Sequence, residues 1–377
     1  MNGETRTILR IKCLLFLLAL AAQVPLASAT VTNYVGSCAS GSYATISAAL
    51  ATTPAPNFVY VCPGTYPEQI VISKPVTLEG IYTSNAGQAF ITVPSGGLTG
   101  SNPCYPELGY VQVCVSSKGA VNITNITVDG YGQTTEPTGI AYYNGSGGTM
   151  NHIETRFQEG DGLGVGIYVF GSSGTVTVEN SNLHNFNFTG ILTSASSTVK
   201  IEGNTLAPDS NAEAAIGAFN GASTTISGNV INGPSAPAGC DPTYGYFCAG
   251  ILASPASAGS ITNNTVAGVG GGYPGILILG EGDYPTTMSV TSNAIFNIAG
   301  GDGIQLNTFE AAVPPLTIKD NVITQAQNGV NFECTLDNNV SSNTITAMSS
   351  YGVANVASGE DSPNTYYNVP TLYSTCP

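Results

Sequence analysis

Basic residues are scarce in this sequence of 377 residues. It holds eight Lys and Arg against 23 Asp and Glu, only two His and no Trp, and its formal net charge is −15. A chain this acidic repels nucleic acids, anionic membranes and polyanionic glycans at long range. We therefore expect no nucleic-acid partner, and a highly acidic polysaccharide is a poor substrate unless cations bridge it.

Long apolar runs are also missing after the first 30 residues. Near the start, Arg6, Arg10 and Lys12 precede an apolar run from Cys13 to Ala22, and Ala27-Ser28-Ala29 follows. This layout is typical of a cleavable secretory signal, because a membrane span needs about 20 apolar residues. We expect residues 1–29 to be a signal peptide. The remaining chain, 30–377, is then a secreted, periplasmic or cell-surface monomer without a membrane span, with five basic and 22 acidic residues and a net charge of −17.

Eight cysteines lie after the expected cleavage site. The sequence contains no CxxC motif and no Cys/His cluster, so these cysteines do not predict a metal site. An even number of cysteines in an exported chain predicts disulfides, although eight cysteines allow 105 pairings. We expect neighbours in the sequence to pair: Cys38 with Cys62, Cys104 with Cys114, Cys240 with Cys248, and Cys334 with Cys376.

A short pattern recurs along the chain: an apolar residue, an Asn three positions later and a second apolar residue at position five. The full copies begin at Ile201, Ile226, Ile261, Val290, Ile318 and Val340, 22 to 35 residues apart. A second apolar stretch that begins with glycine, such as Gly250-Ile251, follows each copy except the one at Ile201, where Ala215-Ile216 takes its place. Repeats of this length indicate a solenoid, in which each unit buries its apolar face only against its neighbours.

The repeats have the character of β-strands. They are rich in Val, Ile and Thr with a period of two, and no stretch sustains a period of 3.6. The pattern predicts an all-β, single parallel β-helix of roughly ten or more coils over residues 30–377. Residues 30–82 form the cap and first coils, and 360–377 form a C-terminal tail. Coils lie about 4.8 Å apart, so the repeated Asn residues are expected to form an inward ladder of amides, the alternative being exposed turn asparagines.

The N-terminal part carries a second signal. A helix-like stretch, 45–50, precedes the motif Val61-x-Pro-Gly-Thr-Tyr-x-Glu68 and then Ile72-x-Lys-x-x-Thr-Leu-x-Gly80. This order resembles the start of pectinesterases and related proteins of the pectin-lyase-like superfamily. The resemblance implies a right-handed parallel β-helix with a short N-terminal capping helix.

The catalytic motifs of that family are not found. An active pectinesterase would imply a QDT-like turn, a DFIFG-like strand and an Arg-Pro-Trp. The nearest match to the strand is 167–171, with Ile167 in place of the nucleophilic aspartate, and the chain has no Trp. Polygalacturonase-like motifs are missing too, and one arginine after residue 29 does not suit a pectate lyase. We expect no pectinesterase activity, and an enzyme of this sequence would be a polysaccharide lyase or resemble a glycoside hydrolase.

Stacking of coils predicts one cluster of functional side chains. Three imperfect copies of the repeat begin at Ile123, Met150 and Val178, and their position six carries Asp129, Arg156 and His184. Stacked coils would align these three side chains in an outward row about 5 Å apart. His184 would serve as general base, Arg156 would bind a carboxylate or oxyanion, and Asp129 would orient Arg156 or act as an acid. The alternative is a surface ion pair of Asp129 and Arg156, which contributes under about 1 kcal/mol. Nearby aromatic residues are candidates for substrate binding: Tyr131, Phe157 and Phe186.

A second alignment, counted from the glycine strands, gathers carboxylates on three successive coils. They are Glu281, Asp283, Glu310 and Asp337. Such a ridge suits Ca²⁺, which prefers six to eight oxygen ligands, or an acid and base pair for glycoside hydrolysis. The alternative is a solvated acidic turn region. We expect no other cofactor.

Two functions remain open. The first is glycan binding or processing by an exported β-helix with a polysaccharide partner, which rests on fold analogy. The second is a non-catalytic surface, adhesin or envelope structural protein, for which a rigid acidic rod is sufficient.

Overall fold

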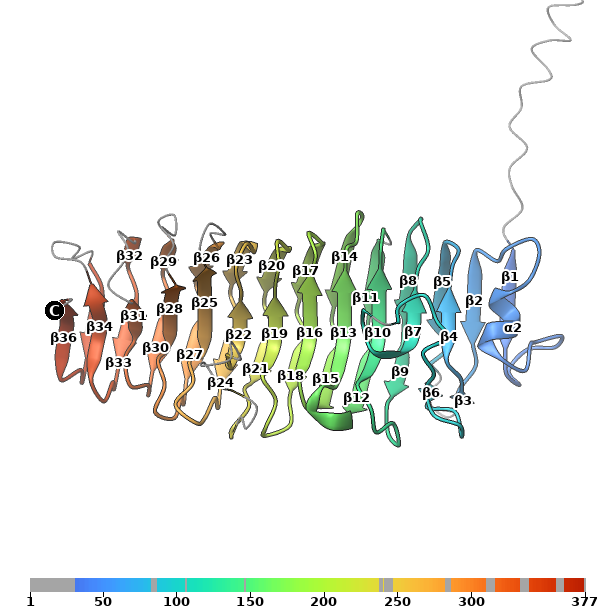
Figure 1. Cartoon of the computed structure of the whole chain (residues 1–377), viewed down its shortest axis with the longest axis horizontal. Coiled ribbons are helices and arrows are strands. Elements are labelled where there is room, and N and C mark those ends of the chain that lie inside the picture. Colours follow the sequence, from blue (N-terminus) through green and yellow to red (C-terminus); the bar gives the residue numbers. More distant parts are fainter. Residues whose placement is uncertain are drawn as a thin grey trace, which may run out of the picture. The chain divides into compact units, whose positions relative to one another are not determined.

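The computed structural model describes residues 31–82, 87–105, 107–145, 147–236, 240, 247–281, 286–309, 316–332, 339–356 and 363–375. The chain divides into the unit Met1–Val31 and the unit Thr32–Pro377, of which the second carries the fold. This unit is a parallel β-helix of three 12-stranded sheets, here called A, B and C (Figure 1). One short α-helix, α2 (Ile46–Leu50), and one 3-10 helix, η1 (Gly160–Gly162), accompany the described strands. The fold prediction is confirmed.

Each coil takes one strand from each sheet in turn. Sheet A consists of β1 (Thr32–Val35), β2 (Phe58–Val61), β5 (Val76–Gly80), β8 (Val121–Thr124), β11 (Gly148–Asn151), β14 (Thr175–Glu179), β17 (Thr198–Glu202), β20 (Ser223–Ser227), β23 (Ala258–Thr262), β26 (Thr287–Thr291), β29 (Thr317–Lys319) and β32 (Asn339–Ser341). Sheet B consists of β3 (Gly64–Pro67), β6 (Ala89–Thr92), β9 (Ile126–Asp129), β12 (Glu154–Gln158), β15 (Asn182–Phe186), β18 (Thr205–Ala207), β21 (Val230–Asn232), β24 (Thr265–Ala267), β27 (Ala294–Phe296), β30 (Val322–Thr324), β33 (Thr344–Thr346) and β35 (Thr365–Tyr367). Sheet C consists of β4 (Ile70–Ile72), β7 (Tyr110–Val115), β10 (Pro137–Tyr143), β13 (Val165–Phe170), β16 (Thr189–Ser194), β19 (Ala214–Ala218), β22 (Ala249–Ala253), β25 (Ile276–Glu281), β28 (Ile304–Phe309), β31 (Val330–Phe332), β34 (Tyr351–Val356) and β36 (Thr371–Thr375). Strands β35 and β36 lie in the expected C-terminal tail.

The interior of the coils is one continuous apolar core. Strand pairing is in register from coil to coil, so that Ile201 pairs with Ile226 and Ile226 with Ile261. Identical apolar positions therefore stack in columns, and all three residues are fully buried. Each coil buries its inward side chains only against the coils before and after it, as the repeat predicts.

The repeated asparagines form the expected ladder. Six of them are at most 1% exposed: Asn204, Asn229, Asn264, Asn293, Asn321 and Asn343. The side-chain oxygen of Asn204 accepts the backbone N–H of Ser181 at 3.0 Å. The other five each accept two hydrogen bonds on this oxygen, from the backbone N–H and the side-chain amide of the Asn one coil earlier; for Asn264 these bonds from Asn229 measure 3.0 and 2.9 Å. The ladder runs on to Asn364, which accepts the same pair of bonds from Asn343 at 2.9 and 3.0 Å. The alternative of exposed turn asparagines is wrong.

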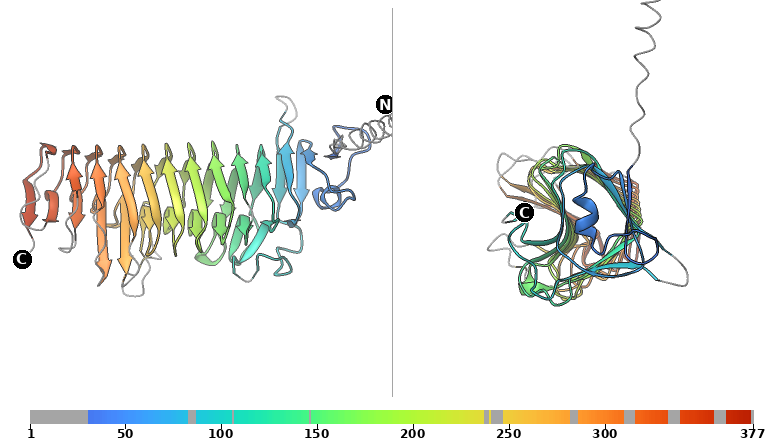
Figure 2. Two further views of the ribbon diagram at one scale, coloured as in Figure 1. Left: turned by 90° about the horizontal axis from the view of Figure 1, so that it is seen from above. Right: turned by 90° about the vertical axis from the view of Figure 1, so that its right-hand side faces the viewer.

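Helix α2 closes the N-terminal end of the core (Figure 2). Its side chains Ile46 and Ala49 are fully buried, and the hydroxyl of Thr45 accepts the N–H of Ala48 at 3.2 Å. The carboxylate of Glu68 accepts the backbone N–H groups of Ile46 at 2.7 Å and Ser47 at 3.0 Å. A carboxylate at the N-terminus of a helix accepts hydrogen bonds from N–H groups that have no partner within the helix, and its negative charge interacts favourably with the helix dipole. Glu68 of the N-terminal motif thus fastens the cap to the first coil.

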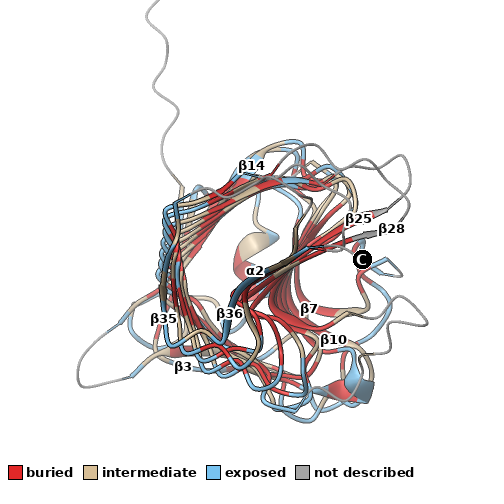
Figure 3. Cartoon of the chain, turned by 90° about the vertical axis from the view of Figure 1, so that its left-hand side faces the viewer, coloured by how far each residue is buried: buried red, intermediate tan, exposed pale blue. Residues whose placement is uncertain are grey.

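Sheet C departs from the expected period of two. Strands β14 and β17 of sheet A alternate between buried and more exposed residues, whereas β16 and β19 of sheet C are buried at every position. In Figure 3, the sheet that contains β7 and β10 is correspondingly mostly red. Outside the main core, Cys114 of β7 packs in a cluster with Cys104 and Leu108, and Leu252 of β22 packs in another with Leu277. Sheet C is therefore covered on both faces along these strands, as a strand buried on two sides requires.

Three of the four expected disulfides are present. They join Cys38 to Cys62, Cys104 to Cys114, and Cys240 to Cys248. Cys334 and Cys376 lie outside the described residues, as does the expected signal peptide. Within the described part of the chain, no helix is both long and apolar enough to cross a membrane.

Candidate functional site

The outer face of sheet B brings together the three candidate catalytic residues. Asp129 on β9 pairs in register with Arg156 on β12, and Arg156 pairs with His184 on β15. All three side chains are partly exposed, by 13%, 28% and 25% respectively. The predicted row therefore exists, while the catalytic roles of its members stay predictions.

The guanidinium of Arg156 is held by Asp129. Its Nε and Nη2 atoms donate to the same oxygen, Oδ2 of Asp129, at 3.0 and 2.9 Å. The other oxygen of Asp129 accepts the backbone N–H of Tyr131 at 2.9 Å. Nε and Nη2 of Arg156 and both oxygens of Asp129 thus already have hydrogen-bond partners. The remaining nitrogen of Arg156, Nη1, faces Glu154.

Glu154 connects this pair to His184. Its Oε1 atom lies 2.9 Å from Nε2 of His184 and 3.5 Å from Nη1 of Arg156, and its Oε2 accepts the hydroxyl of Thr127 at 2.9 Å. Burial raises the pKa of Glu154, but the hydrogen bonds of His184 and Thr127 and the charge of Arg156 outweigh it and lower the pKa overall. The carboxylate therefore stays ionised at neutral pH. The sequence analysis missed Glu154, although a residue two positions before Arg156 on a strand shares its face.

His184 has oxygen atoms opposite both ring nitrogens. Nδ1 lies 2.6 Å from Oδ1 of Asn185, and Nε2 lies 2.9 Å from Glu154. Both ring nitrogens therefore lie within hydrogen-bonding distance of an oxygen atom. In this arrangement His184 has no free nitrogen with which to act as a general base.

Aromatic rings border the network on one side. Tyr131 is 77% exposed, and its ring meets Phe157 edge to face at a centroid distance of 5.8 Å. The guanidinium carbon of Arg156 lies 5.3 Å from the ring centroid of Phe90 and 5.7 Å from that of Phe157. Phe157 also contacts the ring of His184 at 6.4 Å. Tyr131 and Phe157 thus present apolar surface next to the charged groups.

The third aromatic candidate, Phe186, was assigned wrongly. Its side chain is fully buried in the core and cannot contact a substrate. Asn185 and Phe157 both have a positive φ, 53° and 56°, in the left-handed region. This interrupts the alternation of each strand, so the following residues, Phe186 and Gln158, pair in register and both point inward.

The carboxylate ridge falls largely outside the described residues. Glu281 ends β25, but its side chain and the residues Asp283, Glu310 and Asp337 are not described. Among the side chains that are described, no three of His, Cys, Asp or Glu gather where they could hold a metal ion. The calcium site stays a prediction.

Two other carboxyl groups are perturbed by burial. Burial raises the pKa of Glu213, next to the start of β19, to about 8. Burial also raises the pKa of Asp302, although the amides of Asn328 and Asn331 donate to it, each at 2.7 Å. Neither residue was singled out by the repeat pattern, because desolvation depends on neighbours from other coils.

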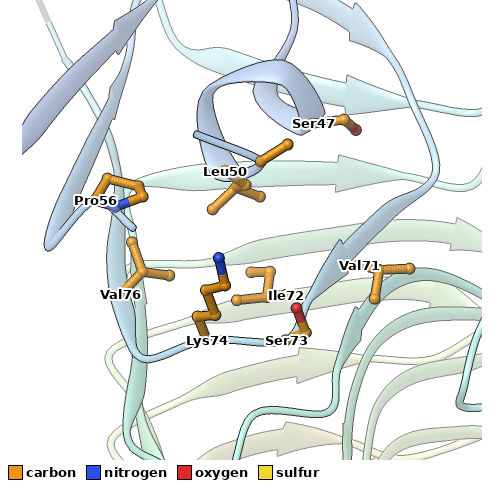
Figure 4. A pocket seen from close by; sticks show the side chains of 9 residues that line it. Ser47, Leu50, Pro56, Val71, Ile72, Ser73, Lys74 and Val76 are labelled. Carbon is orange, nitrogen blue, oxygen red and sulfur yellow. The ribbon is translucent and has the colours of Figure 1, made fainter. Parts of the chain in front are cut away.

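A pocket lies beside the capping helix (Figure 4). Apolar side chains such as Leu50, Ile72 and Val76 line it, together with Lys74, Ser47 and Ser73. The lining offers one ammonium and two hydroxyls and contains no carboxylate. It therefore lacks an acid and base pair, and we assign no chemistry to it.

Residues 79–266 match the protein family described as "Right handed beta helix region". This match agrees with the three parallel sheets. The chain is a right-handed parallel β-helix. No curated protein matches the sequence of this β-helix significantly.

Solved structures with the same fold are distant in sequence. The catalytic domain of GH87 alpha-1,3-glucanase in complex with nigerose is 14% identical, with a TM-score of 0.55, and the match covers 90% of this β-helix and 66% of that chain. The AlgE4 A-module of Azotobacter vinelandii mannuronan C-5 epimerase is 14% identical with a TM-score of 0.46, and the match covers 84% and 88%. At 14% identity, the likeness to the glucanase domain shows the fold alone.

The position of the pectinesterase nucleophile is structural in this β-helix. Ile167 of β13 is fully buried and pairs in register with Ile140 and Ile191 in a core column. A side chain in this column faces the other inward residues and not a substrate. The expectation of no pectinesterase activity stays a prediction.

Proposed function

We propose that this β-helix is an exported glycan-binding protein, and that the glycan lies on the outer face of sheet B. The observation that carries the proposal is the network of Asp129, Glu154, Arg156 and His184, bordered by Tyr131 and Phe157. Partly exposed polar groups of this kind bind hydroxyls, and adjacent aromatic rings pack against the apolar face of a sugar.

Binding is better supported than catalysis. Two of the donors of Arg156 and both nitrogens of His184 already have partners, and Glu154 is ionised. A general acid needs a proton to give and a general base needs a free lone pair at the operating pH. Proton transfer between a substrate and His184 or Glu154 would first have to break their contacts with each other, with Asn185 and with Thr127, whereas ligand binding leaves these contacts in place.

The charge of the network restricts the ligand. The network contains two carboxylates, Asp129 and Glu154, and one permanent positive charge, on Arg156. Its net charge is therefore negative when His184 is neutral and zero when His184 is protonated. The chain as a whole carries a net charge of −15. A glycan without negative charge therefore fits the site better than a uronic acid polymer. The α-1,3-glucan acted on by the GH87 neighbour supplies a reasonable first test ligand.

The test is calorimetric titration of the exported protein with neutral gluco-oligosaccharides and with oligouronates. Tyr131→Ala should weaken binding of the neutral oligomer by about tenfold, the loss of one good stacking contact. Tyr367→Ala is the matched control, because Tyr367 is 58% exposed on β35 at the far end of the same sheet. Equal affinities for Tyr131→Ala and the wild type would refute the proposed site.

A further inference from the structure

A second open pocket, of about 370 Å³, lies on the outside of the first coils. Tyr34 on β1, Tyr60 on β2 and Glu79 on β5 occupy adjacent positions of one outward column of sheet A. Tyr82 follows β5, and Asn125 lies between β8 and β9, so both belong to the corner between sheets A and B. The pocket is therefore separate from the network around Arg156 and from the pocket beside the capping helix.

Aromatic rings form one wall of this pocket. The rings of Tyr34 and Tyr60 lie 5.4 Å apart with an interplanar angle of 30°, and Phe58 stacks on Tyr60 at 6.1 Å. Tyr34 is 38% exposed and Tyr82 is 66% exposed. Farther along sheet A the same column continues with Thr124 and Asn151. The aromatic surface is thus confined to the first strands, next to Glu79.

The polar groups of the pocket have no partners within the described chain. The carboxylate of Glu79 and the side-chain amide of Asn125 make no hydrogen bond or ion pair there, and no lining residue is basic. Glu79 is only partly exposed. A partly buried carboxylate without a counter-ion gains free energy when a cation binds it, especially beside aromatic faces.

We propose that this pocket binds the protonated amine of an amino sugar, so that the glycan recognised by the protein is amine-bearing. The ammonium pairs with Glu79, the sugar ring packs against Tyr34 and Tyr60, and Asn125 exchanges hydrogen bonds with a hydroxyl. The inference rests on the proposed function, because it names the class of glycan and adds a second contact to it. N-acetylation removes the charge, so the acetylated sugar loses the contact with Glu79.

Calorimetric titration of the exported protein with tetramers of glucosamine, N-acetylglucosamine and glucose tests this inference. The glucosamine tetramer should bind about tenfold more tightly than the other two at low salt, the gain from one charge-assisted hydrogen bond. Glu79→Gln should remove this preference and leave the melting temperature unchanged. Glu202→Gln is the matched control, because Glu202 lies in the same outward column with Glu179 and Ser227 as neighbours.

The outcomes separate this inference from the proposed function. If Glu79→Gln binds the three tetramers in the same ratio as the wild type, the amine site is refuted. In that case a loss of glucose-tetramer binding in Tyr131→Ala would still support the sheet B site. If instead Glu79→Gln removes the preference and Tyr131→Ala changes nothing, the amine site stands and the sheet B site fails. Failure of all three tetramers to bind would overturn both.

Discussion

Replacing one rung of the asparagine ladder tests how the coils are held together. Asn264 is 1% exposed, and its Oδ1 accepts the backbone N–H and the amide of Asn229 at 3.0 and 2.9 Å. Its own amide donates to the carbonyl of Ile226 at 2.9 Å and to Asn293 at 3.0 Å. Leucine has a similar volume and none of these groups. The substitution therefore removes hydrogen bonds with little change in packing.

The cost follows from which groups lose their partners. The backbone N–H of Asn229 is fully buried and has no other acceptor in the ladder, whereas the amide of Asn229 keeps the carbonyls of Ile201 and Ser227. A stranded buried donor costs about 1–3 kcal/mol, and each further lost bond costs about 1 kcal/mol. We expect Asn264→Leu to lower the free energy of unfolding by about 2–5 kcal/mol.

Urea unfolding, monitored by circular dichroism, measures this change. A loss of stability lowers the urea concentration at the midpoint and leaves the m-value, the slope of free energy against urea, unchanged. The matched control is Asn339→Leu, the same substitution at an exposed position of β32. The control should leave the midpoint almost unchanged, because surface substitutions alter stability by about 0.5 kcal/mol at most. If Asn264→Leu shifts the midpoint no more than Asn339→Leu does, the ladder does not stabilise the coils and the reasoning fails.

Three further predictions concern single side chains. Glu68→Ala should lower the free energy of unfolding by about 1–2 kcal/mol, because the N–H groups of Ile46 and Ser47 lose their acceptor, and urea unfolding measures it. Glu213 has its pKa raised to about 8 in the folded state and an ordinary pKa of about 4.3 in the unfolded state, so only the folded state holds the proton between these values. Stability should therefore fall as pH rises from about 4.3 to 8, by at most about 1.4 kcal/mol per pH unit, and Glu213→Gln should flatten this slope. Arg156→Lys keeps the charge and loses the two-pronged contact with Asp129, so glycan titration should show weaker binding with a stability change under about 1 kcal/mol.

Each of these predictions has a contradicting result. An unchanged midpoint in Glu68→Ala would mean that the cap does not depend on this carboxylate. A pH slope that Glu213→Gln leaves intact would assign the slope to other groups. Glycan binding that survives Arg156→Lys and His184→Ala together would remove the network from the proposed function and leave Arg156 as a structural ion pair.

The sequence alone determined the fold. The repeated Asn, the alternating apolar residues and the cap motif are local patterns, and each places its residues in the core or at the cap through strand periodicity and chain connectivity. The disulfides between near neighbours followed from the same connectivity. Asp129, Arg156 and His184 could be aligned because stacking turns a sequence spacing of one coil into contact.

Only the tertiary structure decided how these residues interact. The positive φ at Phe157 and Asn185 moved Phe186 from the surface to the core, and no periodicity reveals such an interruption. Glu154 connects the other members of the network because His184 contacts it from the next coil and Arg156 contacts it from the same strand. The pocket around Glu79 arises where three strands and a corner meet. Desolvation, ion pairing and register depend on side chains far apart in sequence, so they are set by packing and not by any local pattern.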